Sequence, residues 1–486
     1  MMYKPTLDEV KSIFRENKGN MVPLYREINA DLETPVAAFL KVATGPYSFL
    51  LESVEGGERQ ARYSFIGTEP YDVLKTGPRT ELGDIDPLVP LQDKLALYKS
   101  VPVGDLPRFL GGAIGYLSYE TFRYYEPRVT SPEADPLGVP ESVLMFTDTL
   151  LVFDHVKHVI KLVSHVHLRD NIEVAYREAA DRIETMARRL EADLDDSGRP
   201  GNTNHLKSEV SNFSKEEYID VVNRCKQYII AGDIIQVVPS RRIARNTYAE
   251  PFSIYRALRT LNPSPYMYFL KMDDFYIIGA SPETLVRVEE GFVYNYPLAG
   301  TVRRGVDPEE DASLEEKLRN DEKEMAEHIM LVDLGRNDVG KVSESGSVKV
   351  NDLARVVKYS HVMHLESEIQ GKLRSDKTIF DALRSCMPAG TLSGAPKIRA
   401  MEIIAEVERE KRGPYGAAVG YFGFHGNMDT AIPIRTIVMK NGVAYLQAGG
   451  GIVYDSDPES EWQETVNKMA APARAIVVAE ESQLSK

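Results

Sequence analysis

Two acidic pairs stand far apart in this sequence, and each has the spacing of neighbours on one face of a helix. The first is Glu324-x-x-Glu327 and the second is Glu461-x-x-Glu464. Residues with this spacing point to the same side of a helix, so each pair presents its two carboxylates together. Two such faces brought together would form an oxygen-rich pocket that suits Mg²⁺, an ion usually shared with its substrate. The spacing therefore points to a magnesium site.

Taken alone, either pair is more often a solvated helix face than a metal site. On a helical wheel the first helix has a core stripe formed by Leu318, Met325, Ile329 and Val332. Leu331 falls between Glu324 and Glu327, so their face is not purely polar, as expected of a cleft wall. The second helix begins with Pro458 in its first turn and Asp457 or Ser456 as its cap.

Three consecutive glycines, Gly449, Gly450 and Gly451, precede the second pair. Without side chains, their backbone N–H groups can approach an anion closely. A metal together with exposed amides is what an enzyme needs to hold a small, highly anionic substrate.

Length and composition narrow the class of protein. A chain of 486 residues exceeds one ordinary core, so we expect one large domain or two interlocked ones. With 43% hydrophobic and 27% charged residues it has the composition of a soluble globular protein. The 73 acidic and 58 basic residues give a net charge of −15, which argues against nucleic acid as the main partner.

Neither a membrane nor an oxidising compartment is expected. No apolar run approaches the length of a membrane span, and residues 1–17 do not resemble a signal peptide. Cys225 and Cys386 have no C-x-x-C context and cannot build a disulfide framework, which fits a reducing cytoplasm.

A polar, turn-rich stretch at residues 191–212 predicts a boundary between an N-terminal region, 1–200, and a C-terminal one, 212–486. A long helix is expected before it, at 172–190. After it, Ser214 and Glu217 form a capping box that opens a helix to Ala231, which Gly232 ends.

Strand-like and helical segments then alternate irregularly. Strands are expected at 47–53, 64–67, 149–153, 159–165, 234–238, 266–271, 275–280, 285–288, 362–369, 419–424, 430–439 and 443–448. Helices are expected at 251–261, 317–334, 378–386, 396–409 and 458–479. Short turns such as Lys440-Asn441-Gly442 favour antiparallel pairing. We therefore predict an α+β fold with large, mainly antiparallel sheets flanked by helices.

A series of motifs in the C-terminal half resembles the motifs of a known enzyme family. They lie at residues 232–240, 280–283, 297–301, 331–338, 362–364, 388–397, 420–423, 434–436 and 448–452. In this order they resemble the chorismate-utilising enzyme family over residues 212–478.

Within that family, the N-terminal half is similar to the large component of anthranilate synthase. The matching segments are 50–53, 62–67, 109–116 and 119–120. The resemblance implies a feedback site for tryptophan at Ser53, Pro265, Tyr266 and Met267.

A few positions distinguish the branches of the family. Members that add water to chorismate have a lysine as base where Gln236 stands, and Gln cannot act as a base. Many aminodeoxychorismate synthases carry a lysine where Ala299 stands, and Thr391 is the residue expected of an anthranilate former. Tyr296 and Leu298 depart from the arginine and isoleucine usual there.

The resemblance also implies a distribution of roles. Glu327 and Glu464 would contact Mg²⁺ directly, while Glu324 and Glu461 would act mainly through water, and the ion would hold the ring carboxylate. Amides of Gly449, Gly450, Gly451, Gly300 and Thr301 would add donors, and Arg435 with Tyr415 would hold the enolpyruvyl carboxylate.

In the reaction that the resemblance implies, ammonia attacks ring carbon C2 as the C4 hydroxyl leaves, and this leaving group needs a general acid. We assign that role to Glu283, whose buried carboxyl would have a raised pKa. His364 belongs to the later stage, the loss of pyruvate. Gln236 and Thr391 complete the predicted catalytic set.

Ammonia is expected from a separate glutamine amidotransferase subunit, because neither Cys225 nor Cys386 suits a nucleophilic role. A hetero-oligomer inhibited by tryptophan is therefore implied. Two alternatives stay open: an aminodeoxychorismate synthase large subunit, which stops before pyruvate loss, and a non-catalytic, tryptophan-binding regulatory protein.

Overall fold

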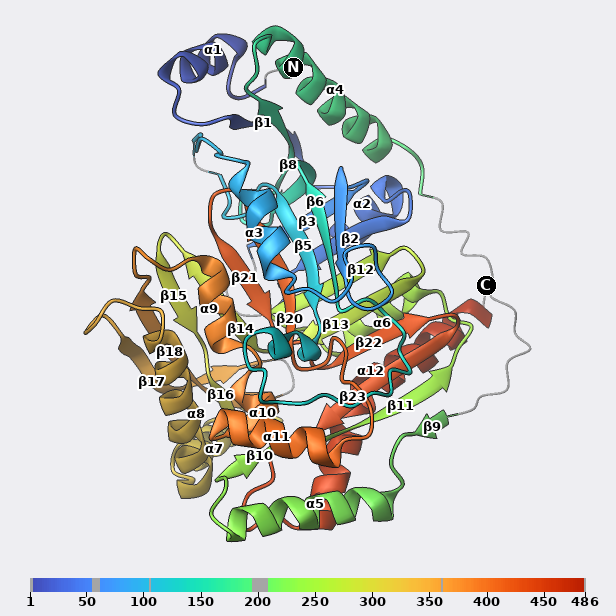
Figure 1. The fold of residues 1–486 in the computed structure, drawn as a ribbon. Coiled ribbons are helices and arrows are strands. Elements are labelled where there is room, and N and C mark those ends of the chain that lie inside the picture. The colour runs from blue at the N-terminus through green and yellow to red at the C-terminus, as the bar shows by residue number, and fades with distance from the viewer. Residues whose placement is uncertain (1–2, 55–61, 105, 195–208, 360–361, 485–486) are drawn as a thin grey trace.

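The computed structural model describes residues 3–54, 62–104, 106–194, 209–359 and 362–484. Most of the predicted linker, residues 195–208, lies outside this part of the chain. Two large antiparallel sheets dominate the fold, as predicted, and helices lie around them (Figure 1). The mixed α+β class and the antiparallel pairing are therefore confirmed.

The first sheet has 11 strands. Their order is β1 (Met21–Asn29), β8 (Val159–His167), β7 (Thr149–Asp154), β3 (Tyr63–Thr68), β2 (Tyr47–Glu52), β12 (Tyr266–Met272), β13 (Phe275–Ser281), β22 (Thr436–Lys440), β23 (Val443–Gly449), β11 (Ser240–Asn246) and β9 (Glu209–Ser211).

The second sheet has 10 strands. Their order is β16 (Leu298–Arg303), β18 (Val362–Lys372), β15 (Phe292–Asn295), β14 (Thr284–Glu289), β21 (Met428–Ala431), β20 (Ala418–Gly423), β5 (Gly112–Leu117), β6 (Ser142–Thr147) and β4 (Asp72–Thr76), with β17 (Lys349–Lys358) paired to β18. A two-stranded pair joins β10 (Gln236–Val237) to β19 (Gly394–Ala395).

Each sheet contains strands from both halves of the chain. In the first sheet β2 pairs with β12, so that Glu52 lies opposite Met267. In the second sheet β5 pairs with β20, so that Tyr116 lies opposite Val419. The halves are therefore interlocked by backbone hydrogen bonds rather than merely docked.

Aromatic side chains from both sheets fill the core between them. The Phe109 ring lies 4.4 Å from that of Tyr421 in the second sheet and 5.5 Å from that of Phe65 in the first, measured between centroids. All three are at most 9% exposed. Contacts of this kind fix how the two sheets sit on each other.

The helices are α1 (Leu7–Glu16), α2 (Pro35–Val42), α3 (Leu88–Ala96), η1 (Tyr119–Tyr124), α4 (Ile172–Leu190), α5 (Lys215–Ile230), α6 (Pro251–Leu261), α7 (Pro308–Arg319), α8 (Glu322–Gly340), α9 (Ile379–Cys386), α10 (Gly390–Ser393), α11 (Lys397–Val407) and α12 (Pro458–Leu484). The predicted helix 172–190 is confirmed, and so is the capping box of α5: Glu217 N–H donates to Ser214 Oγ and Ser214 N–H donates to the Glu217 carboxylate.

The predicted helix 317–334 is wrong, because two separate helices, α7 and α8, cover this stretch. Asp321 caps α8, accepting hydrogen bonds from the N–H groups of Lys323 and Glu324. Glu324 therefore lies in the first turn of a new helix. Ile329, predicted to be core, is 38% exposed, because the buried face of α8 runs instead through His328, Leu331 and Gly335.

The predicted strand 430–439 is also interrupted. It divides into β21 and β22, and Pro433 lies in the gap. Arg435 there has a φ of 52°, in the left-handed region, which does not continue a regular strand.

Arg412 is the most deeply buried cation of the described residues, at 1% exposure. Its guanidinium donates to the Glu408 carboxylate at 2.6 Å, to Leu392 O at 2.7 Å and to Val238 O at 2.7 Å. The backbone N–H of Arg412 donates to Glu120 Oε1 at 2.7 Å. One side chain thereby ties together segments that are far apart in sequence.

Both cysteines are buried and free. Among the described residues, no helix is long and apolar enough to cross a bilayer.

Candidate functional site

A cavity of about 540 Å³ brings together the residues predicted to do chemistry. Of the predicted catalytic, metal-binding and substrate-binding residues, those that line it are Gln236, Glu283, Gly300, Thr301, Glu324, Glu327, His364, Thr391, Tyr415, Arg435, Gly449, Gly451, Glu461 and Glu464. Gly450 is not in this lining, but its backbone lies against the side chain of Glu461. Residues up to 228 positions apart in the chain thus share one site.

The two acidic pairs enter this cavity from the first two turns of α8 and α12. Burial raises the pKa of the Glu324 carboxyl, and the neighbouring Glu327 raises it further. Burial also raises the pKa of Glu461, assisted by Glu464. Glu461 Oε2 is buried without a hydrogen-bond partner. Like charges are therefore concentrated where a cation would relieve them.

The carboxylates do not form a ready-made metal cage. Glu464 lies 2.6 Å from Lys468 Nζ, and Glu327 Oε1 accepts a hydrogen bond from Gln236 Nε2 at 3.1 Å. Across the described residues, no group of three or more acidic, histidine or cysteine side chains is arranged to hold a metal ion. Carboxylate oxygens are donors that suit Mg²⁺, but Glu464 and Glu327 are here engaged by Lys468 and Gln236.

The three glycines are needed because other groups approach their backbone closely. A Cβ on Gly450 would lie 2.5 Å from Glu461 Oε2, and one on Gly451 would lie 2.6 Å from Gln236 Nε2. A Cβ on Gly449 would meet Pro239 O at 2.5 Å. A side chain on Gly450 or Gly451 would push Glu461 or Gln236 out of place, and one on Gly449 would clash with the backbone of Pro239.

Glu283 faces the cavity just after the end of β13, and it is 8% exposed. Burial raises its pKa to about 7, although the hydroxyl of Thr391 and the charge of Lys468 oppose the shift. Thr391 Oγ1 donates to Glu283 Oε1 at 2.9 Å. The Glu283 carboxyl is thus oriented, and it keeps its proton to near neutral pH.

His364 is held in one tautomer by its neighbours on β16. Its Nδ1 lies 2.7 Å from Gly300 O, which can only accept, so Nδ1 carries the proton of the neutral ring. Thr301 Oγ1 lies 3.1 Å from the same nitrogen. Burial lowers the pKa of His364, so the ring is neutral at physiological pH and Nε2 keeps its lone pair.

The strand is interrupted between β21 and β22, and Arg435, which lies in this interruption, lines the cavity. Its guanidinium donates to Lys468 O. Burial lowers the pKa of Arg435, although Tyr415 is close enough to raise it, and burial raises the pKa of Tyr415. A guanidinium held in this surrounding favours an anionic ligand.

Two lysines in the cavity wall were not predicted from the sequence. Lys468 Nζ contacts Glu464 and donates to Gly449 O at 2.9 Å, and Lys323 precedes Glu324. The i,i+4 spacing of Glu464 and Lys468 is a signal that would have placed the latter beside the acidic pair.

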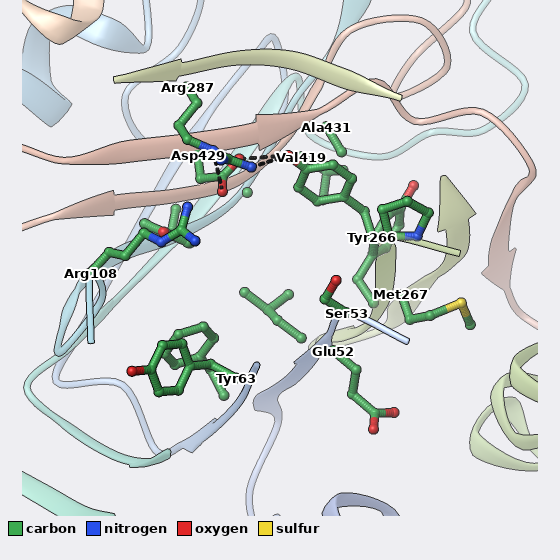
Figure 2. Close-up of a pocket in the computed structure, with 16 residues that line it drawn as sticks. Glu52, Ser53, Tyr63, Arg108, Tyr266, Met267, Arg287, Val419, Asp429 and Ala431 are labelled. Atoms are coloured by element: carbon green, nitrogen blue, oxygen red, sulfur yellow. Dashed lines mark hydrogen bonds and ion pairs between the residues drawn. The ribbon is translucent and has the colours of Figure 1, made fainter. Parts of the chain in front are cut away.

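A second cavity contains the four residues predicted to bind an effector. Ser53, Pro265, Tyr266 and Met267 line it together with strands β20 and β21 (Figure 2). Tyr63 and Arg108 lie across the cavity from Ser53 and Tyr266.

Its walls are mainly aromatic and apolar, with a polar corner. In that corner Arg287 Nε donates to Asp429 Oδ2 at 3.1 Å, and Tyr266 OH donates to Asp429 Oδ1 at 2.9 Å. Glu52 turns away from the cavity and binds Arg259 at 3.0 Å. Such a space suits a small amphipathic ligand with a flat apolar part.

Comparison with known proteins places these features in a family. The family model described as chorismate binding enzyme matches residues 47–474. Anthranilate synthase component 1 of Acetivibrio thermocellus is 49% identical, over 98% of this chain and 99% of its own length. The crystal structure of anthranilate synthase component I from Streptococcus pneumoniae is 37% identical, with a TM-score of 0.78 over 92% of this chain and 99% of that one.

The menaquinone-specific isochorismate synthase of Escherichia coli shares the fold at 19% identity, with a TM-score of 0.70 over 97% of this chain and 98% of that one.

The raised pKa of Glu283 predicts a pH-dependent stability difference for Glu283→Gln. Because the folded pKa exceeds the unfolded one, the stabilisation from the protonated carboxyl is complete below pH 4.5 and is lost as the pH rises to about 7. The amide does not titrate. Relative to the wild type, the variant should therefore gain about 3 kcal/mol in free energy of unfolding between pH 5 and pH 8.

Urea unfolding of both proteins at the two pH values checks this. An equal difference at pH 5 and pH 8 would show that Glu283 ionises in its ordinary range.

Proposed function

The chain belongs to the chorismate-binding enzyme family, and from that premise we propose that it converts chorismate and ammonia to anthranilate and pyruvate, the first step of tryptophan biosynthesis. The observation that carries this proposal is the near-full-length similarity to proteins named anthranilate synthase component 1. The residues of the larger cavity supply a chemically complete route.

The presence of Gln236 in the cavity wall supports ammonia, rather than water, as the nucleophile. A base is needed to activate water, and an amide cannot take a proton. Ammonia already carries a lone pair and needs only to be held. Gln236 is 3% exposed and faces the substrate space beside Glu327.

Glu283 is the general acid for the departing C4 hydroxyl in this proposal. Its pKa of about 7 keeps it protonated in neutral solution. Since Thr391 donates to Oε1, Oε2 is the oxygen that would carry the proton to the leaving group. The hydroxyl then leaves as water as ammonia bonds to ring carbon C2.

His364 then serves pyruvate loss. With Nδ1 committed to Gly300 O, its Nε2 can accept the proton from C2 as the enolpyruvyl ether bond breaks. Enolpyruvate takes up a proton and becomes pyruvate, and the ring becomes aromatic. Arg435 and Tyr415 would orient the enolpyruvyl carboxylate meanwhile, while amides of Gly300, Thr301 and the three glycines provide further donors.

We further propose that Glu324, Glu327, Glu461 and Glu464 hold Mg²⁺. The unpartnered Glu461 Oε2 and the raised pKa values of Glu324 and Glu461 support a cation there. When bound, the ion would neutralise the ring carboxylate of chorismate. For Glu464 to take part, Lys468 must give up its ion pair, and the substrate's second negative charge offers that lysine a new partner.

The smaller cavity is proposed to bind tryptophan as a feedback inhibitor. The aromatic walls fit an indole, and the polar corner fits an amino acid's charged groups. Ammonia would come from a separate glutamine amidotransferase subunit, giving a hetero-oligomer. The free, buried cysteines are in keeping with a cytoplasmic location.

One assay tests the reaction. The purified chain with chorismate, Mg²⁺ and ammonium at mildly alkaline pH should form anthranilate and pyruvate in equal amounts, identified by mass. An amino-chorismate without pyruvate would assign the protein to the aminodeoxychorismate branch. Tryptophan binding without turnover would favour a regulatory protein.

The metal assignment predicts that Glu327→Gln lowers Mg²⁺-dependent turnover at least about 100-fold, because one negative oxygen donor is lost. Glu322→Gln is the matched control, since Glu322 lies exposed in the first turn of the same helix. Turnover against Mg²⁺ concentration, with thermal unfolding to verify the fold, is the measurement. Near-normal activity of Glu327→Gln would refute the assignment.

The effector assignment predicts that Ser53→Phe weakens tryptophan inhibition at least about tenfold, because the larger side chain fills the cavity. Turnover without tryptophan should persist. Inhibition curves for the two proteins decide this, and superimposable curves would remove tryptophan from this cavity.

A further inference from the structure

We propose that Thr284 is a positioning residue that transmits effector occupancy from Tyr266 to Glu283. The inference rests on the proposed function, in which tryptophan fills the smaller cavity and Glu283 acts in the larger one. It specifies how the two sites are connected.

The two cavities are linked through the adjacent residues Glu283 and Thr284, since Thr284 contacts Tyr266 in the wall of the smaller cavity. Glu283 lines the larger cavity, whereas the hydroxyl of Thr284 lies 2.8 Å from the hydroxyl of Tyr266 in the wall of the smaller one. Successive side chains of an extended chain point to opposite sides. Adjacent residues at the start of β14 therefore face different sites.

The direction of this hydrogen bond follows from its neighbours. The phenol of Tyr266 has one proton and donates it to Asp429 Oδ1 at 2.9 Å. Thr284 must then donate to the phenol oxygen. Because Thr284 is 7% exposed, its hydroxyl has little access to water as a substitute partner.

The backbone on either side of Glu283 is anchored to the same wall. Ile432 N–H donates to Glu283 O at 3.1 Å, and Ile432 follows Ala431 in the wall of the smaller cavity. Ser281 Oγ donates to Ile432 O at 2.7 Å, and Ser281 is the strand partner of Tyr266. A displacement of Tyr266 would therefore reach Glu283 through both side chain and backbone.

The ladder is irregular at this point, which allows it to shift. The pairing of β14 with β21 changes register between Thr284 and Val286. Irregular pairing yields more readily than a continuous ladder. A displacement of about 1 Å at a general acid is enough to cost on the order of 100-fold in rate.

The test separates effector binding from inhibition. Thr284→Val keeps the shape and removes the hydroxyl. It should bind tryptophan with a Kd within about threefold of wild type by calorimetry, while the tryptophan concentration for half-inhibition of ammonia-dependent turnover rises at least about tenfold. Thr284→Ser keeps the hydroxyl and should restore inhibition.

Thr430→Val is the matched control on the neighbouring strand. Its side chain is also buried, at 1% exposure, but the hydroxyl donates to Val286 O at 2.8 Å rather than to Tyr266. It should be inhibited like wild type. If Thr284→Val fails to fold, Thr284→Ala, which also removes the hydroxyl, should uncouple binding from inhibition in the same way.

Two results overturn the inference: normal inhibition of Thr284→Val, or loss of inhibition that merely follows loss of binding. The wild-type arm tests the proposed function separately. A wild type that forms anthranilate but neither binds tryptophan nor is inhibited by it would reject the effector site, and the coupling with it.

Discussion

The buried guanidinium of Arg412 is the interaction on which the larger cavity depends. It joins Glu408 to the carbonyls of Leu392 and Val238, next to the segments that carry Thr391 and Gln236. A buried charge is costly unless its donors are satisfied, so these segments can take essentially one arrangement. The ring of Tyr415 lies 5.7 Å from the guanidinium carbon, so a fourth part of the site is set by the same group.

Charge is distributed unevenly in a protein with a net charge of −15. The larger cavity holds its own cations, Lys323, Lys468 and Arg435, in the same wall lining as the four glutamates. A dianionic substrate would meet positive charge only after entering, which favours a correctly oriented ligand over a bulk anion. Burial shifts the pKa values of Glu283 and His364 in opposite directions, so that the carboxyl keeps its proton and the imidazolium loses one.

Local signals predicted the elements well. The helices at 172–190 and 251–261, the capping box at Ser214 and most strands follow from periodicity and end signals within a few residues. The motif segments also named the residues that gather in the two cavities. These features are set by residues that are close together in the sequence, so they can be predicted from it.

The misses have non-local or backbone causes. Asn320 caps the end of α7 and Asp321 caps the start of α8 without proline or glycine, and Arg435 follows the interruption after β21 in a left-handed conformation. The pairing of β2 with β12 joins residues more than 200 positions apart, and no local pattern encodes it. Lys468 was missed because a lysine beside glutamate on a helix usually forms only a surface pair.

The interleaved sheets impose an order on biosynthesis. β22 and β23 insert between β13 and β11, while β20 and β21 insert between β5 and β14, so interior strands of both sheets are among the last translated. Until residue 431 has been made, the nascent chain presents unpaired strand edges in both sheets, and those of the first sheet persist until residue 449 has been made. The polypeptide consequently emerges with hydrophobic strands that have no partner yet, and such edges are the parts of a growing chain most prone to aggregation.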